Sequence, residues 1–306
     1  MTTAPDTERE LKELLEEVRR IDVLSRRIVN DVLAGGYSSV FRGAGLEFES
    51  VREYVDGDDP RKVDWNVTAR MGRPFVKTYV EEREQTVLFL LDLSASMTGG
   101  FSAWSARQMA ARVAACLALA AVRNDDKVGL IAFSDTVDKY VPPKKGAAHG
   151  LRIVRDCLAL SGSSARTDVA PALEFASRVV GRHAVVFLVS DFLTDGWQRA
   201  LSLCARRHDV VAIRLLVPEL APPGTGLLRV HDPESGREHV IDWRSRRVRA
   251  AYEDRVAEWR ARTDEQLRRA RVDVMDVPVP RTRDIDAVAR PIVRFFRMRA
   301  ARGAKR

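Results

Sequence analysis

The sequence predicts an α/β protein built on a doubly wound, mostly parallel sheet, with a small β-rich unit on its N-terminal side. The first observation is a series of near-continuous apolar segments of strand length, such as TVLFLLD (86–92) and AVVFLVSD (184–191). The second is that amphipathic helical segments alternate with them along the chain. Strands that are apolar throughout are typical of parallel sheets, because helices cover both faces of such sheets.

The remaining segments continue this alternation. Two more apolar strands are expected at 127–135 and 209–217, and a last one at VDVMDVPV (272–279). LLRVHDPESGREHVIDW (227–243) is typical of a hairpin, with its turn between Asp232 and Gly236. Helical spacing predicts the helices between and after the strands: over 104–123, near 151–160, from after Thr167 to about 180, over 197–207, within the charged segment 244–272 and from about 284 onward.

Three parts are predicted along the chain. Residues 1–36 contain an amphipathic helix, because apolar residues recur at helical spacing over 6–34 and the pattern ends at Gly35-Gly36. Residues 37–84 have poor periodicity, dense glycines and charges, and short apolar alternations, which indicate the small β-rich unit. Residues 85–306 form the α/β domain, including a C-terminal hairpin and helices.

Composition narrows the class of protein. The 306 residues are 45% hydrophobic, enough to bury a full core. The longest apolar runs are far shorter than the roughly 20 residues of a membrane helix, so no transmembrane segment is expected. The N-terminus is charged from the outset and lacks the apolar core of a signal peptide, which favours a cytoplasmic protein. The three cysteines lack the paired spacing of zinc or redox sites and are expected to be small buried residues.

The formal charge of +8 is unevenly spread, with Arg-rich stretches at 244–272 and 293–306. Such stretches can bind phosphate or an acidic partner. Acidic residues interrupt the first, however, and Phe295, Phe296 and Met298 give the second an apolar stripe suited to docking. Nucleic-acid binding is therefore the weaker interpretation, since no nucleic-acid fold signature accompanies the charge.

Hydroxyl and carboxylate side chains gather where three of the predicted elements end or begin. Asp92, Ser94 and Ser96 alternate along one loop, so that their oxygens can converge on one point. Three hard oxygens suit Mg²⁺, with Mn²⁺ and Ca²⁺ as alternatives, but one short loop cannot complete the coordination. Thr167, before a helix, and Asp191, at the end of a strand, offer further oxygens at the edge where ligands bind in doubly wound sheets. We therefore predict one metal site formed by Asp92, Ser94, Ser96, Thr167 and Asp191.

Each part of this predicted site also has a purely structural interpretation. Asp and Ser are favoured helix N-caps, so the Asp-x-Ser-x-Ser loop alone fits a capping role. Thr167 is equally suited to cap the helix after it, and Asp191 to a turn. The conjunction of all three at strand ends favours the metal site.

Two motifs resemble known families. DLSASM (92–97), Thr167 and the Ser-Asp pair at 190–191 resemble the metal-ion-dependent adhesion site of von Willebrand factor A domains, in which serine, threonine and aspartate oxygens hold magnesium. GAGLEFESVREYVDGDDPRKVDWNVTARMGRPFVKTYVEERE (43–84) closely resembles the signature of the bacterial family called domain of unknown function 58. The resemblance covers about residues 30–220. It implies a von Willebrand factor A-like, Rossmann-like fold and an association with a MoxR-type AAA+ ATPase.

The sequence departs from that family pattern at Arg166, where a glycine more often precedes the threonine. The positive charge of Arg166 opposes a nearby cation, unless its side chain faces solvent or pairs with Asp168. Within 43–84, charges alternate in sign around Tyr54 and Trp65, which indicates an ion-pair network with aromatic anchors against the sheet domain; a partner surface is the alternative. The charged residues are Arg52, Asp58, Asp59, Arg61, Asp64 and Arg70.

The sequence indicates no catalytic residue. The five histidines show no ligand spacing, and there is neither a Gly-x-Ser-x-Gly elbow nor a phosphate-binding Gly-x-x-x-x-Gly-Lys loop. The hydroxyl-rich ligand set resembles the family's use, in which a carboxylate from another protein completes the metal. We therefore expect a magnesium-dependent protein-binding adaptor, not an enzyme, that works with a MoxR-type AAA+ ATPase in chaperone-like assembly or activation of a client bound through an acidic residue. The alternatives are a metal-dependent hydrolase and a basic nucleic-acid or membrane-surface binder.

Overall fold

The computed structural model describes residues 12, 13, 15, 16, 19, 46–55, 57–81, 85–224, 226–284 and 286–303. The predicted N-terminal helix over 6–34 lies outside the described residues, apart from five separate positions. None of the helices in the described ranges is long and apolar enough to cross a membrane.

The chain divides into two compact units, and each is described by itself. The first comprises Arg42–Gln85 and is called the signature unit below. The second contains Thr86–Arg306 and is called the sheet domain.

The signature unit is an antiparallel pair of strands with short helices between them. Its strands are β1 (Leu46–Glu53) and β2 (Phe75–Glu81), and its helices are a short 3-10 turn (Pro60–Lys62) and α3 (Trp65–Met71). Asp64 caps α3 by accepting hydrogen bonds from the backbone N–H groups of the first turn. Helix α3 is absent from the sequence-based expectation, because its seven residues are too few to establish a helical period.

Of the six charged residues predicted to form a network, Arg52 and Asp58 pair with each other, while Asp59 and Asp64 cap the two short helices. The Arg52 guanidinium makes two hydrogen bonds, of 2.7 and 2.6 Å, to the two carboxylate oxygens of Asp58. Tyr54 donates from its hydroxyl to the Asp58 carbonyl oxygen and is half-buried. Trp65 is 72% exposed and anchors nothing within this unit, so its exposed ring instead suits the alternative of a partner surface.

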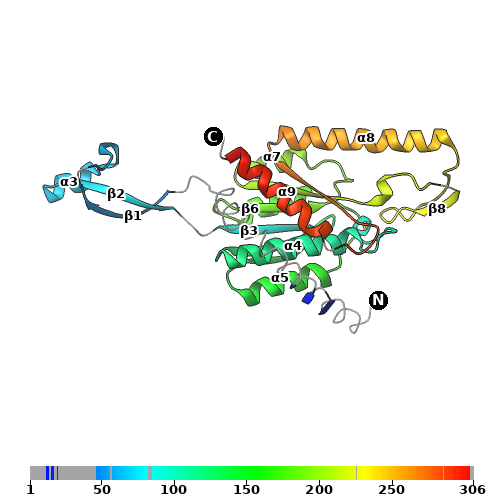
Figure 1. The fold of residues 1–306 in the computed structure, drawn as a ribbon, viewed down its shortest axis with the longest axis horizontal. Coiled ribbons are helices and arrows are strands. Elements are labelled where there is room, and N and C mark those ends of the chain that lie inside the picture. The colour runs from blue at the N-terminus through cyan, green and yellow to red at the C-terminus, as the bar shows by residue number, and fades with distance from the viewer. Residues whose placement is uncertain are drawn as a thin grey trace. The chain divides into compact units, whose positions relative to one another are not determined.

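A six-stranded sheet forms the centre of the sheet domain, in the order β10-β7-β6-β3-β4-β5 (Figure 1). All neighbouring strands are parallel except β5, which runs antiparallel to β4 at one edge. Strand β4, the next in the chain after β3, lies on one side of β3, and β6, the strand after β5, lies on the other side. The strand order therefore reverses at β3. The strands are β3 (Thr86–Asp92), β4 (Lys127–Phe133), β5 (Val137–Lys144), β6 (Val185–Ser190), β7 (Asp209–Leu216) and β10 (Asp273–Pro278).

Helices cover both faces of this sheet, as the apolar strands predict. In β3, Phe89 and Leu91 face a core shared with α4, α5 and α9, whereas Leu88 and Leu90 face one shared with α6, α7 and α8. Figure 1 shows α4 and α5 on one side of the strands and α8 on the other. The helices are α4 (Ala106–Arg123), α5 (Ala147–Ala159), α6 (Ala170–Val179), α7 (Gln198–Ala205), α8 (Arg246–Arg269) and α9 (Asp286–Gly303). The predicted α/β class and the doubly wound, mostly parallel sheet are confirmed.

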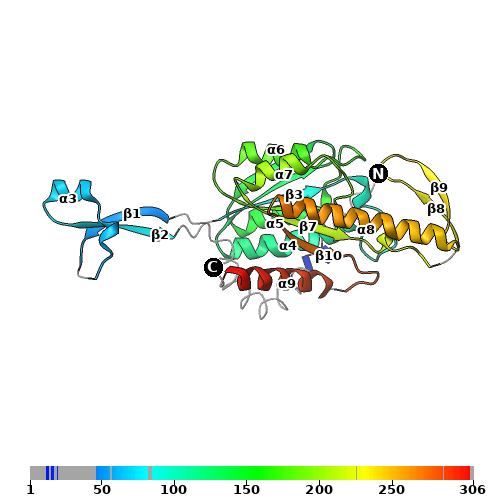
Figure 2. The ribbon, with the colours of Figure 1, turned by 90° about the horizontal axis from the view of Figure 1, so that it is seen from above.

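The predicted hairpin is a two-stranded sheet of its own, formed by β8 (Leu227–His231) and β9 (Glu238–Asp242). Figure 2 shows it as an arm beside the end at which α8 begins. At the base of the arm, Trp243 is 4% exposed and packs edge-on against Tyr252 of α8. The hairpin and α8 are therefore joined at a packed corner.

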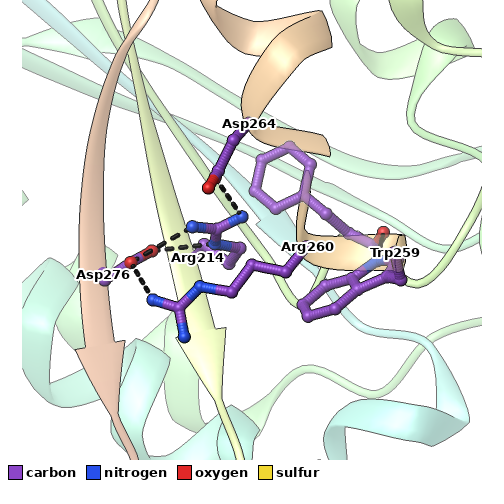
Figure 3. A network of polar contacts seen from close by, with 6 residues as sticks. Arg214, Trp259, Arg260, Asp264 and Asp276 are labelled. Carbon is purple, nitrogen blue, oxygen red and sulfur yellow. Dashed lines mark hydrogen bonds and ion pairs between the residues drawn. The ribbon is translucent and has the colours of Figure 1, made fainter. Parts of the chain in front are cut away.

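Helix α8 is held on the sheet by a buried arginine. The Arg214 side chain on β7 is 2% exposed and forms ion pairs with Asp264 of α8 at 2.7 Å and with Asp276 of β10 at 2.8 Å (Figure 3). Asp276 also accepts a hydrogen bond from Arg260 of α8. A guanidinium this deeply buried requires anionic partners, because an unpaired buried charge is strongly destabilising.

The two acidic partners of Arg214 differ in exposure, and this difference predicts different stability losses. Asp276 is 32% exposed and accepts two hydrogen bonds from Arg214, whereas Asp264 is 52% exposed. We expect Asp276→Ala to lower the free energy of unfolding by about 2 kcal/mol, because it leaves the buried guanidinium poorly paired. Asp264→Ala should cost less than about 1 kcal/mol, since water screens this pair. Chemical denaturation of both variants measures the difference, and equal losses would contradict this ranking.

Candidate metal centre

The candidate metal centre lies where β3 and β6 end side by side. Leu91 of β3 is level with Val189 of β6 in the parallel pair, so the chain leaves both strands at the same edge of the sheet. Asp92 is the last residue of β3, one position past this level, and Asp191 follows the last residue of β6, two positions past it; they are 0% and 4% exposed. The reversal of strand order at β3 is what places these two carboxylates together.

Hydrogen bonds join four of the five predicted ligands into one cluster. The Ser96 hydroxyl donates to Asp191 Oδ2 at 2.7 Å and lies 3.1 Å from the Ser94 hydroxyl oxygen. The Ser94 backbone N–H donates to Asp92 Oδ1 at 2.9 Å, which holds the loop after β3 in a turn around that carboxylate. Ser190, buried at the end of β6, donates from its hydroxyl to Asp92 Oδ2 at 2.6 Å.

Backbone contacts bring a third loop, between α5 and α6, to the same edge. The Ala95 N–H donates to the Ala165 carbonyl oxygen at 3.0 Å. Gly162 allows this approach, because a Cβ there would lie 2.7 Å from the Leu93 carbonyl oxygen. The Thr194 hydroxyl donates to the Thr167 carbonyl oxygen at 3.1 Å, which joins the third loop to the loop that follows β6.

Thr167, the fifth predicted ligand, has a different side-chain partner. Its hydroxyl donates to Glu234 Oε1 at 2.7 Å, and Glu234 lies in the turn of the β8–β9 hairpin. Thr167 is also not the cap of the next helix, because Asp168 Oδ1 accepts from the Ala170 N–H at the start of α6. Backbone contacts thus bring the Thr167 loop to this edge of the sheet, whereas the described hydrogen bond of the Thr167 hydroxyl goes to Glu234 and not to the other four predicted ligands.

The loop after β6 is tightly turned. Phe192 has a positive φ of 57°, an uncommon backbone conformation for a non-glycine residue, and it is buried. Its N–H donates to the Ser190 hydroxyl oxygen, and its carbonyl oxygen accepts from Trp259 Nε1 of α8 at 2.9 Å. A strained backbone conformation persists where the surrounding structure imposes it. At Phe192, strand β6 on one side and helix α8 on the other impose it.

Burial makes the two aspartates electrostatically unfavourable as a pair. Burial, with the neighbouring charge of Asp191, raises the pKa of Asp92 to about 7, and burial also raises the pKa of Asp191. Arg214 stands level with Ser190 on the adjacent strand, but its ion pairs go to Asp264 and Asp276. Among the contacts of the described residues, no Lys or Arg side chain is paired with either site aspartate.

The donor set fits a small, hard divalent cation. It consists of two carboxylates and the hydroxyls of Ser94, Ser96 and Thr167, all oxygen donors of the type that Mg²⁺ prefers. It is unlike a site made of several acidic or imidazole groups, and across the ranges that the structure describes no group of three or more His, Cys, Asp or Glu could hold a metal. A dication bound between Asp92 and Asp191 would neutralise the charges that burial makes costly.

Arg166 is exposed to solvent on the loop before Thr167. Its backbone N–H donates to the Ser164 hydroxyl oxygen at 3.1 Å. Of the two arrangements compatible with a neighbouring cation, the structure has the one in which the guanidinium faces solvent. Asp168 accepts a hydrogen bond from the Ala170 N–H at the start of α6.

Two residues that bond to predicted ligands are missing from the predicted set. Ser190 is the buried hydroxyl that orients Asp92, and its position directly before Asp191 at a strand end was the available signal. Glu234 had no such signal, since it lies 67 residues from Thr167 in a segment whose pattern indicates only a hairpin turn.

Comparisons with known proteins place the chain among relatives. The model of the family described as "Protein of unknown function DUF58" matches residues 50–262. Uncharacterized protein Rv1480 from Mycobacterium tuberculosis and Uncharacterized protein Mb1516 from Mycobacterium bovis are each 30% identical over 235 residues, which is 75% of this chain and 74% of the relative.

Solved structures of similar fold share little sequence with the chain. The conserved hypothetical protein BatB from Bacteroides thetaiotaomicron has 18% identity and a TM-score of 0.42, covering 72% of this chain and 100% of that one. Proximal thread matrix protein 1 from the mussel byssus, in a structure with a zinc-occupied MIDAS motif, has 15% identity and a TM-score of 0.34, covering 43% and 38%. At these levels of similarity no residue role is transferred.

The electrostatics of Asp92 predict an unusual pH dependence for the metal-free protein. Its pKa is about 7 when folded and about 3.8 when unfolded, so between these values the folded state binds more protons and the free energy of unfolding falls as the pH rises. Asp92→Asn removes the charge while keeping the shape. We expect the variant, in EDTA at pH 8, to be more stable than the wild type by at least about 1 kcal/mol.

Denaturation curves of the wild type and Asp92→Asn between pH 5 and pH 8 measure this difference in the free energy of unfolding. Asp195→Asn is the matched control, because Asp195 lies on the loop after β6 but is 72% exposed. A wild-type protein whose stability does not fall over this range would show that burial and the neighbouring charge do not raise the pKa of Asp92 when the metal is absent.

Proposed function

Because the chain belongs to the DUF58 family and carries a buried acidic and hydroxyl cluster at its strand ends, we propose that it is a magnesium-dependent protein-binding module. Asp92, Ser94, Ser96, Thr167 and Asp191 are the proposed ligands, and Mn²⁺ or Ca²⁺ would suit the same oxygens. The observation that carries the proposal is the pair of buried aspartates, linked by serine hydroxyls, with no Lys or Arg partner in the described contacts. Such a pair needs a cation.

The composition of the ligand set supports binding of an acidic partner. Two carboxylates balance the charge of a dication, and the remaining ligands are neutral hydroxyls, so the ion stays attractive to a further anion. Arg166 adds exposed positive charge next to Thr167, which favours the approach of a carboxylate from outside. The partner group we propose is therefore an aspartate or glutamate side chain of another protein.

Exposed apolar side chains lie in the segments that follow two of the ligand loops and on the hairpin. Leu193 is 51% exposed two residues after Asp191, and Phe101 is 82% exposed in the segment that follows Ser96. Val230 and Val240 of the hairpin are 39% and 65% exposed. Polar recognition beside exposed apolar side chains is the usual arrangement of a protein-binding surface.

The partners proposed are a MoxR-type AAA+ ATPase and a client protein, with the chain as an adaptor in assembly or activation of the client. This part of the proposal rests on the resemblance of residues 43–84 to the family signature. We also propose that the chain is not an enzyme, because the described site contacts include no nucleophile paired with a base. Its serine hydroxyls are bonded to carboxylates or to each other, and no histidine takes part.

Metal binding should stabilise the fold by mass action. We expect Mg²⁺ or Mn²⁺ to raise the free energy of unfolding by about 2.7 kcal/mol at a hundredfold excess over its dissociation constant. Asp92→Asn should abolish the gain, while Asp195→Asn should keep it. Thermal melting with and without the ion tests this. A wild-type melting temperature that does not respond to saturating metal would show that the protein has no such metal site.

Partner capture should depend on the same ion. In a pull-down from the source cell we expect an AAA+ ATPase or a client to be retained with magnesium, and at least one such protein to be lost with EDTA or with Asp191→Ala. Thr167→Ala should weaken retention less, because it deletes a neutral ligand and leaves the charge of the site intact. If a folded protein retains the same partners with and without metal, the surface responsible lies elsewhere, for example on basic helix α9.

A further inference from the structure

The signature unit carries a tip between its two strands. Leu46 of β1 pairs with Glu81 of β2 at the end where the chain enters and leaves the unit, and Glu53 pairs with Phe75 at the opposite end. Residues 54–74 join the strands at that opposite end and are called the tip below. Helix α3 therefore lies at the end of the unit away from its two chain connections, as Figure 2 shows.

Contacts with β2 fix the structure of the tip. The Asp64 N–H donates to the Phe75 carbonyl oxygen at 2.8 Å, and the Phe75 N–H donates to the Thr68 hydroxyl oxygen at 3.0 Å. Val67 and Thr68, on the inner side of α3, are half-buried, and Val76 of β2 is 3% exposed. These contacts hold one side of α3 against the strand, so the residues on its other side keep a defined direction toward solvent.

The outer side of α3 exposes a tryptophan. Trp65 is 72% exposed, and Met71 at the end of the helix is 62% exposed. All five tryptophans of the chain lie in the part that the structure describes, and Trp65 is the exposed one among them. The others are buried or half-buried: Trp104, Trp197, Trp243 and Trp259. An exposed indole adds little to the packing of the unit, whereas Trp is enriched among the residues that dominate binding energy in protein interfaces.

Exposed arginines flank this tryptophan in the chain, while the neighbouring acidic residues are already engaged within the unit. Asp58 is held in an ion pair, and Asp59 and Asp64 accept hydrogen bonds from backbone N–H groups of the two short helices. Arg61 and Arg70 are exposed, and the described contacts include no ion pair for either. A partner that approaches α3 therefore meets guanidinium groups that can still pair with carboxylates.

We propose that the tip is a docking surface for an acidic segment of another protein. The Trp65 indole enters an apolar pocket of that partner, and Arg61 and Arg70 pair with carboxylates at the rim of the pocket. The net charge of +8 favours such a partner over a second copy of the chain, because two copies repel each other. None of the proposed metal ligands lies in this surface, so the inference goes beyond the proposed function and adds a second, metal-independent contact.

Photo-crosslinking in the source cell identifies the partner. A photoreactive amino acid replaces Ala69 in the full chain, because Ala69 is exposed and lies one helical turn after Trp65. In the matched control it replaces Leu203, which is 50% exposed on α7. We expect an acidic protein to be linked from position 69 and not from position 203. Links only within the chain, to a second copy or to nucleic acid, or no link at all, would overturn the proposal.

Binding of the linked protein, once purified, to variants of the full chain tests the chemistry of the contact. Trp65→Ala and Arg70→Glu should each weaken binding about tenfold, whereas Arg255→Glu, at an exposed position on α8, should match the wild type. Added salt should weaken binding of the wild type, and EDTA should leave it unchanged.

The possible failures are distinguishable. Equal affinities of Arg70→Glu and the wild type would overturn the acidic partner, and loss of binding in EDTA would assign the partner to the metal centre instead. Equal melting temperatures of the variants exclude misfolding as the cause of weaker binding. A wild-type protein that does not respond to Mg²⁺ would overturn the metal centre and leave this surface standing.

Discussion

The repulsion between two buried carboxylates governs the chemistry at this end of the sheet. Asp92 ends β3 and Asp191 follows its parallel neighbour β6; burial raises the pKa of both carboxyls, and the charge of Asp191 raises the pKa of Asp92 further. Serine hydroxyls from both strand ends bond to them, which compensates part of the lost hydration but supplies no charge. The fold thus maintains a local concentration of negative charge that a bound cation would relieve, and strand order alone brings the two aspartates together.

The surroundings of this pair limit how it can relax. The loop after β6 turns through a positive φ at Phe192 and is fixed to α8 by the Trp259 indole. Helix α8 is in turn held by the buried Arg214, whose ion pairs reach the helix and strand β10. Asp191 therefore cannot swing away from Asp92 without disturbing a helix of 24 residues. In such a rigid setting, ion binding is a more accessible response to the repulsion than rearrangement of the backbone.

The sequence predicts what depends on local pattern and misses what depends on distant contacts or weak signals. Continuous apolar strands predict the parallel sheet and, through the carboxyl-end rule, the convergence of Asp92 and Asp191. Strand β5 was missed because Pro142 and Pro143 lower its strand signal, and prolines are tolerated there because β5 is an edge strand. Helix α3 is too short for a period. Whether the predicted residues bind metal stays a prediction, since the structure shows where their oxygens lie and not what they coordinate.

Glu234 illustrates why such contacts escape a linear pattern. Its hairpin satisfies every local rule for a β-turn, and none of those rules concerns the direction of the carboxylate. Direction comes from the corner at Trp243, where the arm meets α8, and from the loops gathered at the end of β3.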